Sequence, residues 1–353
     1  MEQIEYPSQS LWNTILARPT DSYDSLEPLV KEVFDEVATK GDKAVKQYTE
    51  QFDGVLIEDL QVPQKALEAA AEALSDELKK AMTQAKQNIE KFHRAQKTSK
   101  VELTTQAGVH CWQEKRPVEK VGLYIPGGSA PLFSTIMMLA IPAQIAGCQE
   151  RILCTPPNEK GDVDPAILYA AQLCGITTVY RVGGIQAIAA MTLGTASIPK
   201  VYKIFGPGNQ FVTAAKQWAT KFQVAIDLPA GPSELLVAAD ATSNPNYVAA
   251  DLLSQAEHGP DSQVVLVSTS SSLIEAVRKA IDVQLEQLPR KEIATQALEN
   301  SKAILVASDA AAIDLINAYA PEHYIIMTEN EQDYVDGVQN AGSVFIGAYT
   351  PES

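Results

Sequence analysis

The chain has 353 residues, of which 46% are hydrophobic and 20% are charged, a composition typical of a globular protein with more than one domain. Lysine and arginine total 28 and aspartate and glutamate total 44, so the formal net charge is −16. So acidic a surface repels phosphate groups, which argues against nucleic acid as a partner. The first residues have no basic segment followed by an apolar one, so they do not resemble a secretory signal, and we expect a cytoplasmic protein.

One stretch, residues 121–149, carries no charge and could be mistaken for a membrane span. Three prolines and the pair Gly127-Gly128 interrupt it, whereas a spanning helix needs about 20 mostly apolar residues. We therefore expect a buried strand, a glycine loop and a core helix in this stretch, and no membrane partner.

The first hundred residues are predicted to be mainly helical. Residues 1–20 are polar and show little periodicity, which predicts an arm packed onto a larger body. Apolar residues at helical spacing then predict helices over 24–41, 42–53 and 64–97, the last divided near Ser75.

From Val121 onward, predicted strands and helices alternate. Strands are predicted over 121–125 and 151–155, and strands with their loops over 177–184 and 203–209. Each is followed by a helix, over 134–146, 164–173, 185–192 and 210–220. A strand–helix repeat of roughly 25–30 residues predicts a parallel sheet with helices on its faces and a Rossmann-like topology.

A second alternating stretch follows, with strands predicted over 233–240, 262–269, 303–308, 324–328 and 343–347. The predicted fold class is therefore α/β: two Rossmann-like domains, one inserted in the other, with a helical N-terminal region. We expect an N-terminal arm over 1–20, a first α/β domain built from 21–120 and 233–353, and an inserted Rossmann-like domain over 121–232.

Three glycine-containing loops each follow an apolar strand and precede a helix: PGG at 126–128, VGG at 182–184 and GPGN at 206–209. Open α/β sheets bind ligands at the carboxyl ends of their strands, and the helix N-termini there offer N–H donors to a pyrophosphate. None of the loops is a G-x-G-x-x-G motif, so each one alone is as well explained by a tight turn.

Gln255 and His258 are three residues apart at the predicted end of a helix that stops at Gly259-Pro260, so both side chains can reach one point. An imidazole nitrogen and an amide oxygen form an acceptable zinc pair, although glutamine is an uncommon ligand. The alternative, which residue chemistry alone favours, is a helix C-terminus capped by His258 with Gln255 on the surface.

Glu322 and His323 are adjacent on a predicted helix-to-strand loop that follows Pro321. A carboxylate and an imidazole at such a position suit general acid–base catalysis, and neighbouring side chains that point in different directions could serve different steps. A solvated loop without catalytic function is the alternative on the residues alone.

Several long segments resemble one known family in order and spacing: VGLYIPGGSAPLFSTIMMLAIPAQIAGC, GGIQAIAAMTLGT, KIFGPGNQFVTAAK, AIDLPAGPSELLV, LLSQAEHGPDSQ and APEH. They are similar to the histidinol dehydrogenase family over essentially the whole chain. This resemblance implies the last step of histidine biosynthesis, in which L-histidinol is oxidised to L-histidine by NAD in two steps, through histidinaldehyde. It also implies a homodimer with one zinc ion per subunit.

The resemblance implies a role for each candidate residue. Gln255 and His258 would be zinc ligands that also contact the substrate, and Ser233 would be a further substrate contact. Glu322 would activate water for attack on the aldehyde, and His323 would contact the substrate and remove the alcohol proton.

The resemblance also implies that Tyr124, Gln186 and Asn209 contact NAD, one beside each of the three glycine-containing loops. In the family pattern, the segment GAYTPES is followed by an aspartate zinc ligand and by a C-terminal segment with further histidines. The sequence ends at Ser353, so we expect a truncated chain that binds zinc poorly and shows little activity. The alternatives are a catalytically silent homologue that keeps the fold and binds a nucleotide or partner, and a metallohydrolase, which the absence of H-E-x-x-H disfavours.

Overall fold

The structure is a computed structural model that describes residues 1–19, 25–127, 131–228 and 234–350. The chain divides into two compact units: unit 1 contains Met1–Asp21 and Gly231–Ser353, and unit 2 contains Ser22–Ala230. Each unit has its own sheet and its own apolar cores. Ser233, the expected substrate contact, lies outside the described residues.

Unit 2 is built on a five-stranded parallel sheet in the order β6-β5-β4-β7-β8. Its strands are β4 (Lys120–Tyr124), β5 (Glu150–Thr155), β6 (Thr178–Arg181), β7 (Lys203–Phe205) and β8 (Ala225–Ile226). The first strand lies in the middle, and the chain adds strands first on one side and then on the other. This is the doubly wound, Rossmann-like order that the strand–helix alternation predicts.

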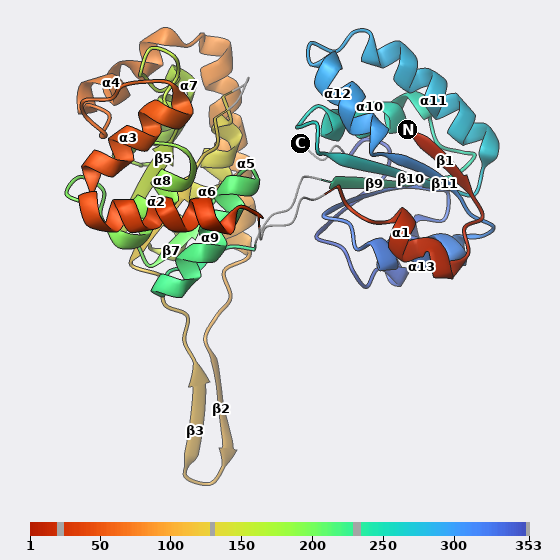
Figure 1. Ribbon diagram of the computed structural model, residues 1–353. Coiled ribbons are helices and arrows are strands. Elements are labelled where there is room, and N and C mark those ends of the chain that lie inside the picture. Colours follow the sequence, from red (N-terminus) through yellow and green to blue (C-terminus); the bar gives the residue numbers. More distant parts are fainter. Residues whose placement is uncertain (20–24, 128–130, 229–233, 351–353) are drawn as a thin grey trace. The chain divides into compact units, whose positions relative to one another are not determined.

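Helices cover both faces of this sheet (Figure 1). One face packs against α4 (Gln64–Ala69), the short helix η3 (Ala70–Ala73), α5 (Asp76–Ala95), α6 (Phe133–Ala146) and α7 (Pro165–Leu173). The other face packs against α2 (Glu27–Lys40), α3 (Asp42–Asp53), α8 (Gly184–Leu193) and α9 (Gln210–Ala219), which is followed by η4 (Thr220–Phe222). The side chain of Ser75 accepts a hydrogen bond from the Leu78 N–H and so begins α5, as the sequence predicts.

This arrangement corrects the expected domain boundaries. Residues 21–120 were expected to belong with 233–353, but the early helices share their cores with the sheet of 120–226. Val33 and Phe34 of α2, for example, belong to the same apolar core as Ile188 of α8. The physical reason is that helical periodicity identifies an apolar face without identifying which sheet covers it.

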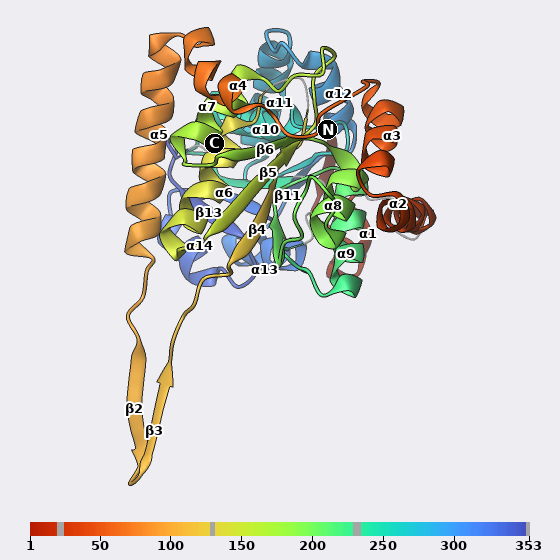
Figure 2. The same ribbon diagram turned by 90° about the vertical axis from the view of Figure 1, so that its left-hand side faces the viewer.

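A two-stranded antiparallel hairpin projects from unit 2, made of β2 (Val101–Gln106) and β3 (Val109–Gln113) (Figures 1 and 2). Every residue in both strands is exposed. Prediction from periodicity did not identify this hairpin, because it has no buried face to impose a clear alternation.

Unit 1 contains a six-stranded parallel sheet in the order β1-β11-β10-β9-β12-β13. Its strands are β1 (Glu2–Glu5), β9 (Glu234–Ala239), β10 (Gln263–Ser268), β11 (Lys302–Leu305), β12 (His323–Met327) and β13 (Ser343–Ile346). Apart from β1, the order repeats that of unit 2. The expected N-terminal arm therefore begins with an edge strand, β1, which pairs with β11.

The sheet of unit 1 is also covered on both faces (Figure 1). One face packs against α10 (Pro245–Ala256), α11 (Ser271–Leu285) and α12 (Lys291–Glu299), and the other packs against α1 (Trp12–Ile15), α13 (Asp309–Tyr319) and α14 (Glu331–Gly337). A turn of 3-10 helix, η1 (Gln9–Leu11), precedes α1. Over the described ranges, no helix is both long enough and apolar enough to cross a membrane.

Candidate functional site

The glycine-containing loops of unit 2 meet at the carboxyl edge of its sheet. Pro156, directly after β5, lies against Gly127 after β4 and against Gly183 after β6. Tyr124, the last residue of β4, contacts Gly206 after β7. Four successive strand ends thus come together around the β4–β7 switch point, where doubly wound sheets bind ligands.

Gly206 is the most tightly held residue of this edge. Its φ is 135°, and a Cβ at this position would lie 2.0 Å from the Tyr124 carbonyl oxygen, so only glycine fits. The Gly206 N–H donates to Asp227 Oδ2 at 2.7 Å, and its carbonyl accepts from Lys216 Nζ at 2.6 Å. Lys216 is 2% exposed and also pairs with Asp227, whose side chain is 29% exposed, so one partly buried ion pair holds both backbone groups of the glycine.

Two helices of at least ten residues begin at this edge with their N–H groups directed towards it. Gly183 is the N-cap of α8, and Asn209 is the N-cap of α9. The Asn209 side chain accepts from the Val212 N–H at 3.1 Å, so it holds the helix start. Paired helix N-termini beside glycine-rich loops suit the pyrophosphate of a dinucleotide.

Tyr124 and Gln186 are buried within unit 2, with exposures of 3% and 0%. The Tyr124 hydroxyl accepts from the Gly184 N–H at 3.1 Å, and burial raises its pKa. Gln186 Nε2 donates to Asp53 Oδ2 at 3.3 Å, while its Oε1 is buried without a hydrogen-bond partner. Burial raises the pKa of Asp53 to about 6. The three expected NAD residues thus lie beside the adjoining loops, but two of them are buried.

The other candidate residues belong to unit 1 and lie at the amino edge of its sheet, whereas those of unit 2 lie at a carboxyl edge. Glu322 and His323 are at the amino end of β12, and β9 begins beside them at Glu234. Helix α10 connects the parallel neighbours β9 and β10, so its C-terminus returns to the same amino edge and carries Gln255 and His258 with it. Parallel pairing therefore brings both predicted motifs to one edge of this sheet.

Gln255 and His258 do approach each other, as their spacing predicts. Gln255 Nε2 lies 3.2 Å from His258 Nδ1, and Gln255 is completely buried while His258 is exposed. The Gln255 Oε1 atom is buried without a hydrogen-bond partner. An orphaned buried oxygen beside an imidazole fits a cation ligand pair. The described residues contain no group of three or more His, Cys, Asp or Glu that could hold a metal, so this pair supplies only part of a zinc coordination shell.

His323 is oriented by the backbone of β9. Its Nδ1 lies 3.2 Å from the Glu234 carbonyl oxygen, and a carbonyl oxygen can only accept a hydrogen bond. The Nδ1 atom therefore carries the proton, and the lone pair of the neutral ring is on Nε2. Glu322 precedes it with a half-exposed side chain, and its carboxylate lies 3.9 Å from His323 Nδ1.

Sequence reasoning missed two residues of this edge, Arg18 and Glu234. The Glu234 carboxylate is ion-paired with Arg18 and accepts a hydrogen bond from the Glu322 N–H at 3.1 Å. A glutamate at the first position of an otherwise apolar strand is the one signal that could have identified the pair, because a buried carboxylate requires a partner.

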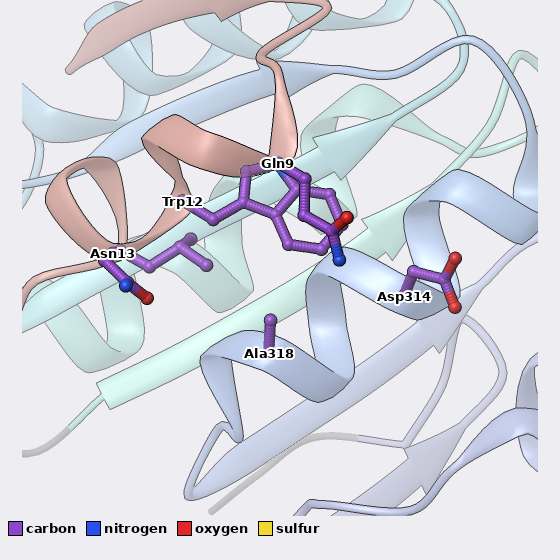
Figure 3. A pocket seen from close by; sticks show the side chains of 6 residues that line it. Gln9, Trp12, Asn13, Asp314 and Ala318 are labelled. Atoms are coloured by element: carbon purple, nitrogen blue, oxygen red, sulfur yellow. The ribbon is translucent and has the colours of Figure 1, made fainter.

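A separate pocket of about 600 Å³ lies in unit 1 between the α1 region and α13 (Figure 3). Gln9, Trp12 and Asn13 form one wall, and Asp314 and Ala318 form the other. None of the candidate residues lines it, so it is distinct from the edge that carries Glu322 and His323.

Comparisons with known proteins found one family and several similar proteins. The family model described as histidinol dehydrogenase matches residues 16–353. The histidinol dehydrogenase of Bacteroides thetaiotaomicron is 55% identical over 353 residues, which are 100% of this chain and 82% of that protein. That of Escherichia coli is 52% identical over 342 residues, which are 96% of this chain and 78% of that protein.

A solved structure gives the same result. The crystal structure of histidinol dehydrogenase from Elizabethkingia anophelis superimposes with a TM-score of 0.96 at 52% sequence identity, over 100% of this chain and 81% of that chain. A betaine aldehyde dehydrogenase from Staphylococcus aureus, solved with NAD+, superimposes with a TM-score of 0.53 at 11% identity, a likeness of fold alone.

Proposed function

Because the chain belongs to the histidinol dehydrogenase family, an oxidoreductase family, we propose that it oxidises L-histidinol to L-histidine through histidinaldehyde, the last step of histidine biosynthesis. NAD, when bound, accepts a hydride in each of the two oxidations. The observation that carries the proposal is the pairing of Glu322 with an oriented His323 at the amino edge of the unit 1 sheet.

His323 is proposed as the base of the first oxidation. Its Nδ1–H is engaged by the Glu234 carbonyl, so Nε2 is the ring atom that accepts a proton from the alcohol. The same hydrogen bond stabilises the imidazolium that forms, because the Nδ1–H becomes more acidic and bonds more strongly. Glu322 is proposed to take a proton from water as that water attacks the aldehyde.

The carboxyl edge of the unit 2 sheet is proposed to bind NAD. The N-termini of α8 and α9 supply N–H donors for the pyrophosphate, and the clamped Gly206 allows close approach of the backbone. Asn209 is proposed to contact the dinucleotide from the start of α9. Tyr124 and Gln186 are proposed to stabilise the loops from within unit 2, since the Tyr124 hydroxyl accepts from the Gly184 N–H and Gln186 is fully buried.

Zinc is proposed as a second cofactor, with Gln255 and His258 contributing two of its ligands. The buried, unpartnered Gln255 Oε1 supports this assignment. Two neutral donors bind zinc more weakly than the three or four ligands of a typical protein site, so this pair by itself is proposed to hold zinc loosely. Family membership also supports a homodimer, and light scattering of the purified protein tests that point.

An NADH absorbance assay, with histidinol and then with histidinaldehyde as substrate, tests the assigned roles. We expect His323→Ala to lower turnover of histidinol by about 100-fold or more, because it removes the base of the first oxidation. We expect Glu322→Ala to slow oxidation of the aldehyde more than that of the alcohol.

The control is His93→Ala, since His93 lies on α5 and its Nδ1 lies 2.7 Å from Oε1 of the exposed Gln96 at the end of the same helix. Zinc analysis of the same preparations tests the Gln255 and His258 assignment. Equal turnover by the His323→Ala chain would contradict the proposed base. Binding of NAD without turnover of either substrate by the unchanged chain would instead favour a silent homologue.

A further inference from the structure

The Arg18 side chain, from the N-terminal segment, contacts the C-terminal end of α13, after which the chain turns towards Glu322. Its Nη2 donates to the carbonyl oxygens of Tyr319 at 2.9 Å and Ala320 at 3.0 Å, and its guanidinium stacks on the Tyr319 ring at 4.7 Å from the centroid. A cation at this position satisfies carbonyl groups that the helix leaves unpaired. Ala320 itself has a φ of 54°, a left-handed conformation that a non-glycine residue adopts only when its surroundings hold it there.

Glu234 connects this arginine to both proposed catalytic residues. Its side chain is 7% exposed, its carboxylate is ion-paired with Arg18, and the same carboxylate accepts from the Glu322 N–H. Its main-chain carbonyl accepts from His323 Nδ1. One residue of β9 thus contacts the backbone of Glu322 and the ring of His323.

On its other side, the same turn is hydrogen-bonded to the backbone of residues 342 and 343. The Gly342 N–H donates to the Pro321 carbonyl at 2.9 Å, and the Ser343 N–H donates to the Glu322 carbonyl at 2.8 Å. A Cβ on Gly342 would lie 2.6 Å from the Glu322 carbonyl oxygen, so the two segments are as close as they can be. The turn of residues 320–323 is therefore fixed by main chain on one side and by the Arg18–Glu234 pair on the other.

We propose that Arg18 and Glu234 are positioning residues, which hold the 320–323 turn so that Glu322 and His323 keep their working geometry. The inference rests on the proposed function, because it assigns the pair a role towards those two residues. Arg18 belongs to the N-terminal segment and lies 216 residues from Glu234 in the sequence. Through Arg18 the N-terminal segment therefore contacts this turn, in addition to pairing with the edge of the sheet through β1.

The proposal predicts an effect on turnover that spares cofactor binding. Loss of Arg18 leaves the buried Glu234 carboxylate without its cation and frees the turn to shift, and a displacement of about 1 Å costs on the order of 100-fold in rate. We expect Arg18→Met to lower kcat for histidinol by about 10- to 100-fold. The KM for NAD should stay within about twofold, because the loops proposed to bind NAD belong to unit 2, whereas Arg18 and Glu234 belong to unit 1.

A second variant and a matched control separate positioning from general damage. Glu234→Gln keeps an oxygen acceptor for the Glu322 N–H but loses the ion pair, so its kcat should fall less than that of Arg18→Met. Arg278→Met is the control: Arg278 is another arginine of unit 1, exposed on α11, and its Nη1 donates to Gln3 Oε1 at 3.1 Å. It should leave kcat and both KM values unchanged.

Hydrogen exchange gives a readout that does not depend on activity. In the unchanged protein the Glu322 amide donates to Glu234, so a peptide covering 320–324 should exchange faster in Arg18→Met and should be unaltered in Arg278→Met. Faster exchange with unchanged kcat would overturn the positioning role, and so would unchanged exchange in Arg18→Met. If the unchanged protein does not oxidise histidinol, the proposed function fails, and exchange of the 320–324 peptide still decides whether Arg18 holds the turn.

Discussion

Asp53 is the last residue of α3, and its carboxyl group lies against the buried amide of Gln186. Burial raises its pKa from 3.8 to about 6, because the charged form has lost solvation without gaining a cation. The native protein therefore binds this proton more tightly than the unfolded chain does. It follows that the free energy of unfolding falls as the pH rises from about 4 to about 6, and that the loss persists above that range.

At the residue scale, we therefore predict that Asp53→Asn stabilises the protein at neutral pH. The gain should be about 1 kcal/mol near pH 7.5, after allowance for the partial exposure of the carboxyl group, and should vanish near pH 3.5, where both native and unfolded carboxyls are protonated. Urea unfolding midpoints at the two pH values measure it.

Asp35→Asn is the control, because Asp35 forms an exposed pair with Lys31 four residues earlier on α2. Its effect should be within about 0.5 kcal/mol at either pH. If Asp53→Asn raises the free energy of unfolding equally at both pH values, the packing of the side chain, and not its charge, makes Asp53 unfavourable.

At the scale of elements, the β7–α9 connection depends on a contact between three segments. Lys216 comes from α9, Asp227 follows β8, and both hold the backbone of Gly206, which follows β7. The glycine-containing loop proposed to bind NAD is thus shaped by a partly buried ion pair from the elements around it. Such a pair costs desolvation when it forms, but the loss of one partner leaves the other uncompensated.

We predict that Lys216→Met destabilises the protein by about 3 kcal/mol and raises the KM for NAD, because Asp227 loses its cation and the Gly206 carbonyl loses its donor. Methionine keeps the apolar stem, so packing is largely preserved. Urea unfolding and steady-state kinetics measure the two effects.

The matched control is Lys221→Met, in η4 directly after α9. Lys221 pairs with Glu27 at 3.1 Å, and both side chains are more than half exposed, so its removal should cost less than about 1 kcal/mol. A Lys216→Met protein with normal stability but a raised KM for NAD would indicate that the lysine touches the dinucleotide directly.

On the scale of the whole molecule, the two units share one strand order but carry their candidate residues at opposite edges. In unit 2 the glycine-containing loops are at the carboxyl edge, which is usual for doubly wound sheets. In unit 1 the four candidate side chains are at the amino edge. The carboxyl edge of unit 1 carries Glu329, Glu331 and Asp333 around a pocket, and such a concentration of negative charge is unsuited to a pyrophosphate.

The division into units makes a prediction about folding. The cores of unit 2 draw only on residues within 22–230, so we expect the fragment 22–230 to fold by itself. The fragment 121–232, which periodicity alone marks as a domain, lacks the helices α2, α3 and α5. It should expose the apolar faces that they cover and should aggregate or stay disordered.

Circular dichroism during heating and the amide dispersion of an NMR spectrum distinguish the outcomes. A cooperative transition for 22–230 and none for 121–232 is expected. A stable, well-dispersed 121–232 fragment would mean that the early helices are dispensable for the core of unit 2.

Much of the fold followed from local pattern. The strand predicted over 262–269 is β10 (Gln263–Ser268), and the helix predicted over 164–173 is α7 (Pro165–Leu173). Both are recognisable because periodicity and capping are properties of neighbouring residues. The same locality placed Glu322 and His323 between a helix and a strand, and placed His258 within reach of Gln255.

Non-local contacts were beyond such reasoning. Whether α2 covers one sheet or another depends on the shape of both partners, which hydrophobic spacing does not encode, so the domain boundary after residue 120 was misplaced. The Arg18–Glu234 pair joins residues 216 positions apart, and nothing near Arg18 indicates its partner. The sequence by itself determined the local elements and their apolar faces; the tertiary structure alone decided what each of them faces, because partner choice depends on contacts distant along the chain.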